Sequence, residues 1–304
     1  MTLANWIGAL PGVLAQGMIW GIMAIGVFIT FRILDIADLT VDGTICTGAA
    51  VCAVLLVSGV NAWAAIAIAT LAGVLCGLIT GILHTFFGIP AILAGILTQM
   101  ILWSANLIIM GKANVALTAV SDSKLISNLD TESLVSNLIL LGFVVAVAGL
   151  LYWFFGTALG VSLRSTGSNH NMSRAQGINT DLAKVLGLMI SNGLVALSGA
   201  LLAQYSNAAD INMGKGAIVI GLAAVVVGEA VVSKISGNFI VKLFGVVVGA
   251  VIYHMIYQTV ILLGMNSDLL KALSAVVVII FLGIPYVKRK YFSKPHLKGD
   301  RKNA

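Results

Sequence analysis

The stretch AWAAIAIATLAGVLCGLITGILHTF, residues 62–86, runs for 25 positions without a single Asp, Glu, Lys or Arg. As an α-helix it would be about 37 Å long, because each residue adds about 1.5 Å along the helix axis. The hydrocarbon core of a bilayer is about 30 Å thick, so a run of this length and composition is typical of a transmembrane helix. The stretch therefore predicts that this part of the chain crosses a membrane.

The rest of the chain has the same character. Of its 304 residues, 60% are hydrophobic and only 9% are charged, and the mean hydropathy is +1.07. A soluble domain carries about 25% charged residues, so lipid must cover most of this surface. We predict an all-α polytopic membrane protein with about nine transmembrane helices, of which the second and seventh are short or broken. The nine candidate spans are residues 10–33, 41–59, 62–86, 89–111, 135–155, 183–205, 216–233, 239–264 and 268–286.

Lys and Arg residues are unevenly divided between the two sides that alternating spans define. With the C-terminus inside the cell, 13 of the 17 basic residues face the cytoplasm. The positive-inside rule then places the N-terminus outside and the C-terminus in the cytoplasm. A basic tail directly after an apolar helix is typical of a cytoplasmic anchor rather than of nucleic-acid binding. We predict one transmembrane domain, residues 1–287, followed by a basic cytoplasmic tail, residues 288–304.

Motifs for bond chemistry are missing from the sequence. It contains no G-x-x-x-x-G-K-[ST] phosphate-binding loop, no H-E-x-x-H and no G-x-S-x-G. Cys46, Cys52 and Cys76 lie singly in apolar stretches, which is typical of packing residues rather than of a disulfide or a metal site. The residues favour a conduit over an enzyme, with no cofactor and no metal in this chain.

Small residues recur on two predicted helix faces. Gly73, Gly77 and Gly81 are four apart, as are Gly245 and Gly249. Helices in lipid associate closely where such residues let the backbones approach. We therefore expect helix contacts at both faces.

Two polar segments interrupt the apolar pattern, each between a long and a short predicted span. The first is DIADLTVDG, Asp35 to Gly43, in which Asp38 or Thr40 could cap the next helix. It could be an ordinary cytoplasmic turn, the polar turn of a broken helix beside a transport path, or a set of metal-binding carboxylates. The second is NAADINMGKG, Asn207 to Gly216. Their similar plan suggests an inverted internal repeat whose two turns face opposite sides.

Polar side chains also occur inside the predicted spans. Such residues commonly bridge helices, and Gln99 and Asn106 are assigned to that role. His254 and Gln258 are four apart on one helix face and could form a polar stripe along a cavity. The candidate residues of a translocation path are Asp38, Thr40, Asp42, Asn192, Gln204, His254 and Gln258.

A polar loop at about residues 156–182 lies on the predicted cytoplasmic side. Its centre reads LRSTGSNHNMSRAQGIN, from Leu163 to Asn179. Ser168 or Asn169 can cap a short helix that ends before Gly177. A helix that mixes apolar and basic residues is typical of a docking element, and the alternative is an ordinary interfacial loop. The residues expected to take part in docking are Arg164, Ser168, Asn169, His170, Met172, Arg174, Ala175 and Ile178.

The pattern from Leu163 to Asn179 resembles the cytoplasmic coupling segment of ATP-binding-cassette importer permeases of the branched-chain amino acid and ribose class. DLTVDG, Asp38 to Gly43, is similar to the segment after the first long span in that class. GAIVIGLAAVVVGE, Gly216 to Glu229, is similar to its second-half counterpart. The resemblance covers nearly the whole chain. It looks most like single-permease systems assigned to the aromatic amino acids tryptophan or tyrosine.

This resemblance implies a permease subunit in the bacterial cytoplasmic (inner) membrane that imports a small solute, such as an amino acid, by alternating access. It implies a second permease copy, forming a homodimer, and a substrate-binding protein outside the cell membrane. It also implies two ATPase subunits, which bind ATP and Mg²⁺ and dock on the loop. The rival hypothesis is a secondary transporter of a small neutral solute that works alone and uses the carboxylates of the first polar segment.

Overall fold

The structure is a computed structural model that describes residues 3–118, 125–126, 133–232 and 238–262, with positions 275, 276, 279 and 283. Six helices in this part of the chain are long and apolar enough to cross a membrane. They are α1 (Leu3–Phe28), which continues through a π-helical turn η1 (Ile29–Ile33), α3 (Ala62–Thr85), α4 (Ala91–Met110), α5 (Ser133–Gly156), α8 (Thr180–Ser206) and α10 (Phe239–Leu262). The chain is therefore an α-helical, multi-pass membrane protein.

Two shorter apolar helices, α2 (Val41–Val57) and α9 (Ala217–Val232), stand where the sequence predicts its second and seventh spans. Eight of the nine predicted spans thus coincide with a helix. The ninth, 268–286, lies almost wholly outside the described residues, and the basic tail 288–304 lies entirely outside them. The total of nine spans and their orientation stay predictions.

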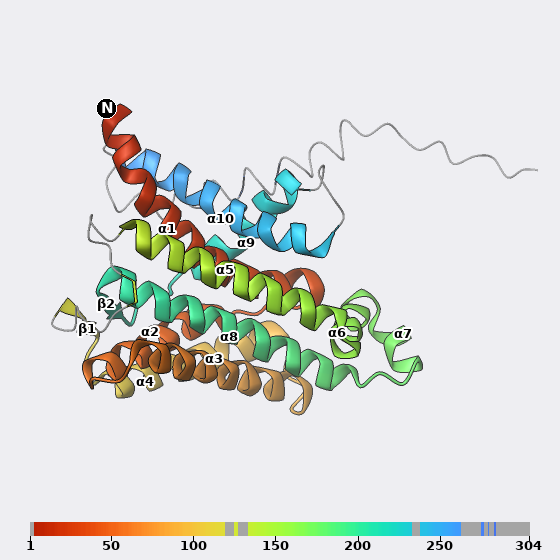
Figure 1. The fold of residues 1–304 in the computed structure, drawn as a ribbon. Helices are drawn as coiled ribbons and strands as arrows, with labels where there is room; N and C mark the ends of the chain where they lie inside the picture. The colour runs from red at the N-terminus through yellow and green to blue at the C-terminus, as the bar shows by residue number, and fades with distance from the viewer. Residues whose placement is uncertain are drawn as a thin grey trace, which may run out of the picture.

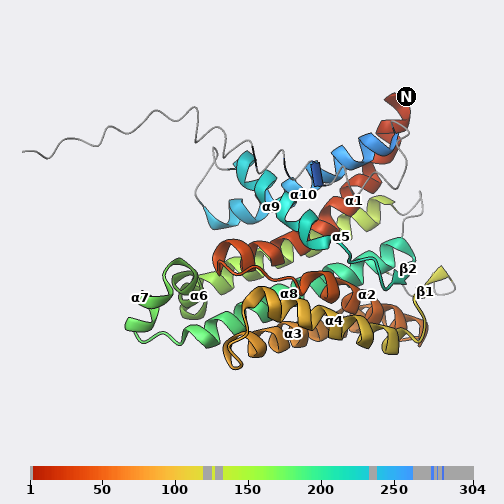
Figure 2. The same cartoon turned by 180° about the vertical axis from the view of Figure 1, so that it is seen from behind.

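Four small elements, two helices and two strands, lie at the two ends of the helical bundle (Figures 1 and 2). At one end α6 (Ala158–Ser168) and α7 (His170–Ala175) connect α5 to α8. At the other end β1 (Asn114–Ala116) pairs antiparallel with β2 (Ala208–Asp210), with Asn114 opposite Asp210. The sequence did not predict this short ribbon, which joins the connection after α4 to the connection after α8.

The glycine faces bring helices into close contact, as the sequence predicts. A Cβ at Gly73 would overlap Asn192 of α8, and a Cβ at Gly77 would overlap the carbonyl oxygen of Leu188. A Cβ at Gly249 would likewise overlap the backbone of α9. Only hydrogen fits between these backbones, so α3 packs tightly on α8 and α10 on α9.

The first polar segment begins where α1 ends in its π-helical turn. The amide of Leu34 donates to the carbonyl of Ile29 at 3.0 Å, and Asp35 then adopts a positive φ of 56°. Non-glycine residues rarely take this left-handed conformation, which here turns the chain away from the helix axis. Residues 36–40 then lead to the start of α2, and the side chains of Asp38 and Thr40 are almost completely buried.

Candidate functional site

Two residues of the first polar segment take part in a buried hydrogen-bonded cluster with side chains of three helices. This cluster, here called the polar centre, consists of Asp38, Thr40, Thr44, Thr80 and Asn192. One carboxylate oxygen of Asp38 accepts from the Thr40 amide at 2.9 Å, and the other accepts from the Asn192 side chain at 2.7 Å. The Thr44 hydroxyl donates to the amide oxygen of Asn192 at 2.7 Å. The hydroxyl groups of Thr40 and Thr80 lie 2.8 Å apart. These bonds join the segment 34–40 to α2, α3 and α8.

The polar centre bears on two of the alternatives left open for the first segment, the ordinary turn and the metal site, whereas a transport path beside it stays a prediction. Each of its five side chains is at most 2% exposed, so an ordinary surface turn is excluded. Of the two residues expected to cap α2, Thr40 stands at the N-cap without a side-chain capping bond, and its hydroxyl lies 2.8 Å from that of Thr80. Asp38 instead accepts from the amide of Thr40 at 2.9 Å. A metal site is not supported either, since no group of three His, Cys, Asp or Glu suited to a metal occurs among the described residues.

Asp42 joins the first polar segment to the second. Its two carboxylate oxygens accept from the amides of Gly216 and Ile218, each at 2.9 Å, at the start of α9. The thiol of Cys46 donates to the carbonyl of Ile211 at 3.3 Å and accepts from the amide of Gly214 at 3.1 Å. The two predicted turns therefore meet inside the bundle, although they are 174 positions apart in the chain.

The two short helices start at this junction and run toward opposite ends of the bundle. Cys52 of α2 contacts Gln204 next to β2, whereas Glu229 of α9 pairs with Arg32 at 2.8 Å near α6. The opposed direction of the two short helices agrees with an inverted repeat. The expectation that the two turns face opposite sides is wrong, because Asp42 of the first turn accepts from the amide of Gly216 at the end of the second.

A cavity of about 230 Å³ opens beside Asp42, between α2, α4 and the second polar segment. Its lining includes Gln99, Trp103 and Asn106 of α4, and Lys215. Sequence reasoning missed this site because it treated Gln99 and Asn106 as separate helix bridges. The signal was their spacing with Trp103, at i, i+4 and i+7, which places all three on one helix face.

The other candidate path residues lie elsewhere. The side-chain oxygen of Gln204 accepts from the amide of Leu125 at 3.0 Å. His254 is 5% exposed, bonds to the carbonyl of Ala250 at 3.0 Å and lies 5.9 Å from the ring of Trp20. Gln258 follows it on α10 and is half-buried. The structure does not bring these residues to the polar centre, and their place on a path stays a prediction.

The predicted short helix in the loop is present as α7. Asn169 is its N-cap, and its side-chain oxygen accepts from the amide of Met172 at 3.0 Å. Ser168 is instead the last residue of α6. Gly177 has a φ of +80°, which ends the helical path as expected. The loop is more ordered than predicted, since α6 occupies residues that were expected to be irregular.

One face of α7 is open and the other is anchored. Met172 is 58% exposed, and Arg174 and Ala175 are exposed beside it, while His170 and Ile178 are partly buried. Ser173 is fully buried, and its hydroxyl lies 2.8 Å from that of Ser165 in α6. The outward residues are those of a surface that can contact another protein.

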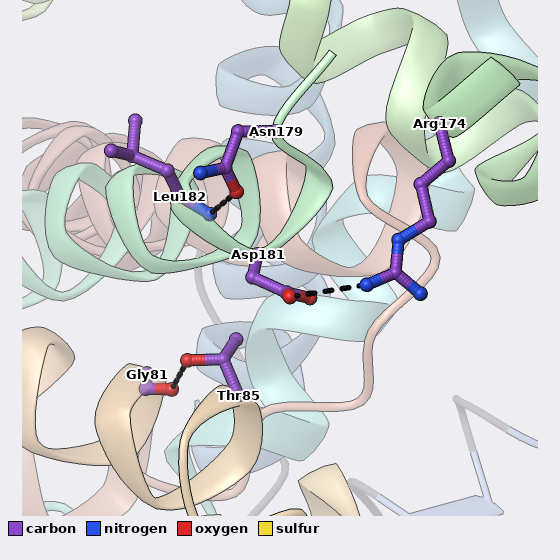
Figure 3. A network of polar contacts seen from close by, with 6 residues as sticks. All are labelled: Gly81, Thr85, Arg174, Asn179, Asp181 and Leu182. Atoms are coloured by element: carbon purple, nitrogen blue, oxygen red, sulfur yellow. Dashed lines mark hydrogen bonds and ion pairs between the residues drawn. The ribbon is translucent and has the colours of Figure 1, made fainter. Parts of the chain in front are cut away.

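Arg174 has a partner in its own chain. Its guanidinium lies 3.5 Å from the carboxylate of Asp181, at the start of α8, next to the Asn179 side chain that caps this helix (Figure 3). Both side chains are about half exposed, so solvent weakens the pair. Arg174 therefore remains accessible to a second carboxylate from outside.

Arg164 is engaged within the chain. It donates to the carbonyl of Phe155, and its guanidinium carbon lies 5.7 Å and 5.3 Å from the ring centres of Phe155 and Phe239. These contacts tie α6 to α5 and α10. The structure thus places Arg164 at the base of the loop, whereas Arg174 lies on its outer face.

Known proteins resemble this chain over most of its length. Residues 10–282 match the family described as branched-chain amino acid transport system / permease component. The chain is 41% identical to a tyrosine transport system permease protein of Clostridioides difficile over 89% of each chain. It is 29% identical to a fructose import permease protein of Bifidobacterium longum, over 80% of this chain and 68% of the relative. It is 28% identical to an autoinducer 2 import system permease protein of Salmonella typhimurium, over 79% and 66%. No solved structure matches the chain.

Proposed function

This chain belongs to the branched-chain amino acid transport permease family, and we propose that it imports an amino acid, with an aromatic one favoured, by alternating access driven by partner ATPases. Members of the family are membrane subunits of ATP-binding-cassette systems that move small solutes. In this proposal the partner subunits bind ATP and Mg²⁺ and hydrolyse the ATP. The membrane is the inner membrane of a bacterium.

The observation that carries the proposal is the capped helix α7 with its outward Met172 and Arg174. An exposed apolar side chain beside a cation, on a short helix anchored through Ser173, suits insertion into a groove of another protein. Because α6 and α7 are fastened to α5, α8 and α10, force applied at α7 reaches the membrane helices. Ser168 and Asn169 are exposed beside this surface, and His170 and Ile178 are partly buried there, so all four are proposed to take part in docking. Arg164 holds the base of the loop through the carbonyl of Phe155.

The choice of an amino acid rests on the relatives. The tyrosine permease is 41% identical to this chain and aligns over 89% of both chains. The sugar and autoinducer permeases are less similar and are longer than this chain. A homodimer of this permease, two ATPase subunits and a substrate-binding protein complete the proposed assembly.

Reconstitution into vesicles tests the proposal. We expect the chain to co-purify with an ATPase encoded beside it and to take up labelled L-tyrosine only when ATP and the binding protein are present. The matched control is the same complex with an ATPase whose phosphate-binding lysine is replaced. Uptake by this polypeptide alone, driven by an ion gradient, would instead establish the secondary transporter and end the proposal. Labelling of residue 170 from outside the cell would also contradict it.

A further inference from the structure

The cavity beside Asp42 has a buried group without a partner. Asn106 is fully buried, and its amide nitrogen makes one long contact of 3.5 Å with the carbonyl of Gly43. Its side-chain oxygen has no hydrogen-bond partner among the described residues. A buried acceptor that lacks a hydrogen bond is unfavourable, so this position favours a ligand that brings a donor.

The cavity also offers a cation at its rim. Lys215 lines it and is exposed, and no ion pair joins it to another described residue. The nearby carboxylate of Asp42 already accepts two backbone amides. A carboxylate on a ligand would therefore find an available ammonium in Lys215, while a ligand ammonium would find the free oxygen of Asn106.

Apart from Gln99, the remaining wall is mostly apolar, and it is partly open. Met100 is 66% exposed and Trp103 is 48% exposed on the same side of α4. The cavity, at about 230 Å³, lies just below the range of about 300–1,000 Å³ that is typical of drug-sized ligands. It suits one small molecule with polar groups at one end and an apolar or aromatic group against Trp103.

We propose that this cavity is a binding site for the transported solute within the permease, and that it recognises a zwitterionic amino acid by its ammonium at Asn106 and its carboxylate at Lys215. The proposal rests on the proposed function and adds a second selection step after the binding protein. It assigns Asn106, Lys215 and Trp103 to specificity, a role that neither the polar centre nor α7 provides.

Direct binding to the purified permease–ATPase complex, without the binding protein, tests the site. The probes are L-tyrosine, L-tryptophan and L-leucine, together with tyramine, which lacks the carboxylate. We expect Asn106→Leu to weaken binding of the amino acids about tenfold, because it removes a hydrogen bond to a charged group. The wild type should bind L-tyrosine more tightly than tyramine. Lys215→Met should bind L-tyrosine only as weakly as it binds tyramine, because the ammonium that pairs with the carboxylate is gone.

Matched variants separate recognition from folding. Asn137 of α5 also has a buried side-chain oxygen without a partner among the described residues, but it does not line this cavity. Asn137→Leu should bind L-tyrosine like the wild type, and Lys112→Met should keep the preference over tyramine. Equal losses in Asn106→Leu and Asn137→Leu, an unchanged preference in Lys215→Met, or no binding of any of the three amino acids would overturn the site. ATP-driven uptake that persists in those cases would leave the importer function standing.

Discussion

At the residue scale, Asn192 joins two parts of the polar centre. It donates to the Asp38 carboxylate at 2.7 Å and accepts from the Thr44 hydroxyl at 2.7 Å. Asn192→Leu removes both bonds and leaves the Asp38 carboxylate short of a partner in the interior. We expect a loss of roughly 2–3 kcal/mol in the free energy of unfolding, measured by denaturation in detergent micelles.

The control for this variant is Asn171→Leu, an exposed asparagine on α7. Its stability should stay within about 0.5 kcal/mol of the wild type, as for most surface substitutions. If the two variants, Asn192→Leu and Asn171→Leu, have the same unfolding midpoint in denaturant, the polar centre does not stabilise the fold.

His170 gives a pH dependence at the start of α7. Burial lowers the pKa of its imidazole below the usual 6.5, and the positive charges of Lys184 and Arg174 lower this pKa further. The negative charge of Asp181 raises the pKa, but by less than the other effects lower it. Because the folded form then binds its proton more weakly, the stability of α7 is complete above about pH 6.5 and falls as the pH drops below it. Hydrogen-exchange protection of α7 should be lower at about pH 5.5 than at about pH 7.5, and His170→Gln should remove that difference.

The sequence identifies most residues of the candidate site but not which of them lie together. Asp38, Thr40, Asp42 and Asn192 stand out in the sequence because charges and amides are costly in apolar surroundings. Their grouping does not follow from the sequence, since it depends on how α2 and α8 are turned. Asn106 was missed for the same reason: on a helix that is apolar all round, hydrophobicity does not reveal which face is buried.

At the scale of elements, the contact of α3 with α8 depends on glycine. A Cβ at Gly77 would meet backbone atoms of Leu188 and Met189, which cannot move aside independently. We expect Gly77→Ala to lower the free energy of unfolding by about 1–3 kcal/mol, as overpacking does. The measurement is the same detergent denaturation.

Gly149 provides the matched control on α5. Nothing lies within 4 Å of a Cβ added there, so Gly149→Ala should be neutral or stabilising by up to about 1 kcal/mol. Destabilisation of both variants to the same extent would mean that helix flexibility, not the contact between α3 and α8, sets the effect.

The membrane helices could be predicted because bilayer thickness fixes their length. The short ends of the bundle could not. The residues of α6 are polar enough to read as a loop, yet its N-cap Thr157, which accepts from the amide of Gly160, and the contacts of Arg164 hold them helical. The strands β1 and β2 pair residues almost 100 positions apart, and three residues give too little pattern to predict.

At the scale of the whole molecule, the proposed function makes Arg174 a contact between the permease and its proposed ATPase. Arg174→Glu should lower the ratio of solute imported to ATP hydrolysed by roughly tenfold, because a like charge would face the carboxylate expected in the partner's groove. Coupled uptake and hydrolysis in reconstituted vesicles measure this ratio.

A charge exchange resolves whether the internal pair is responsible. The double variant Arg174→Glu with Asp181→Arg keeps opposite charges at the contact of Figure 3 but reverses the outer face. It should remain uncoupled. Restored coupling would show that Arg174 acts only by holding α7 to α8.

The helix α9 is fastened at both of its ends. Its first turn is bound by the carboxylate of Asp42 and its last turn carries Glu229, which is bound to Arg32. A short rigid helix held in this way cannot slide along its axis without stretching both sets of contacts. Displacement of Arg32, in the turn that continues α1, would therefore be felt, within the same chain, at the wall of the cavity some sixteen residues of helix away.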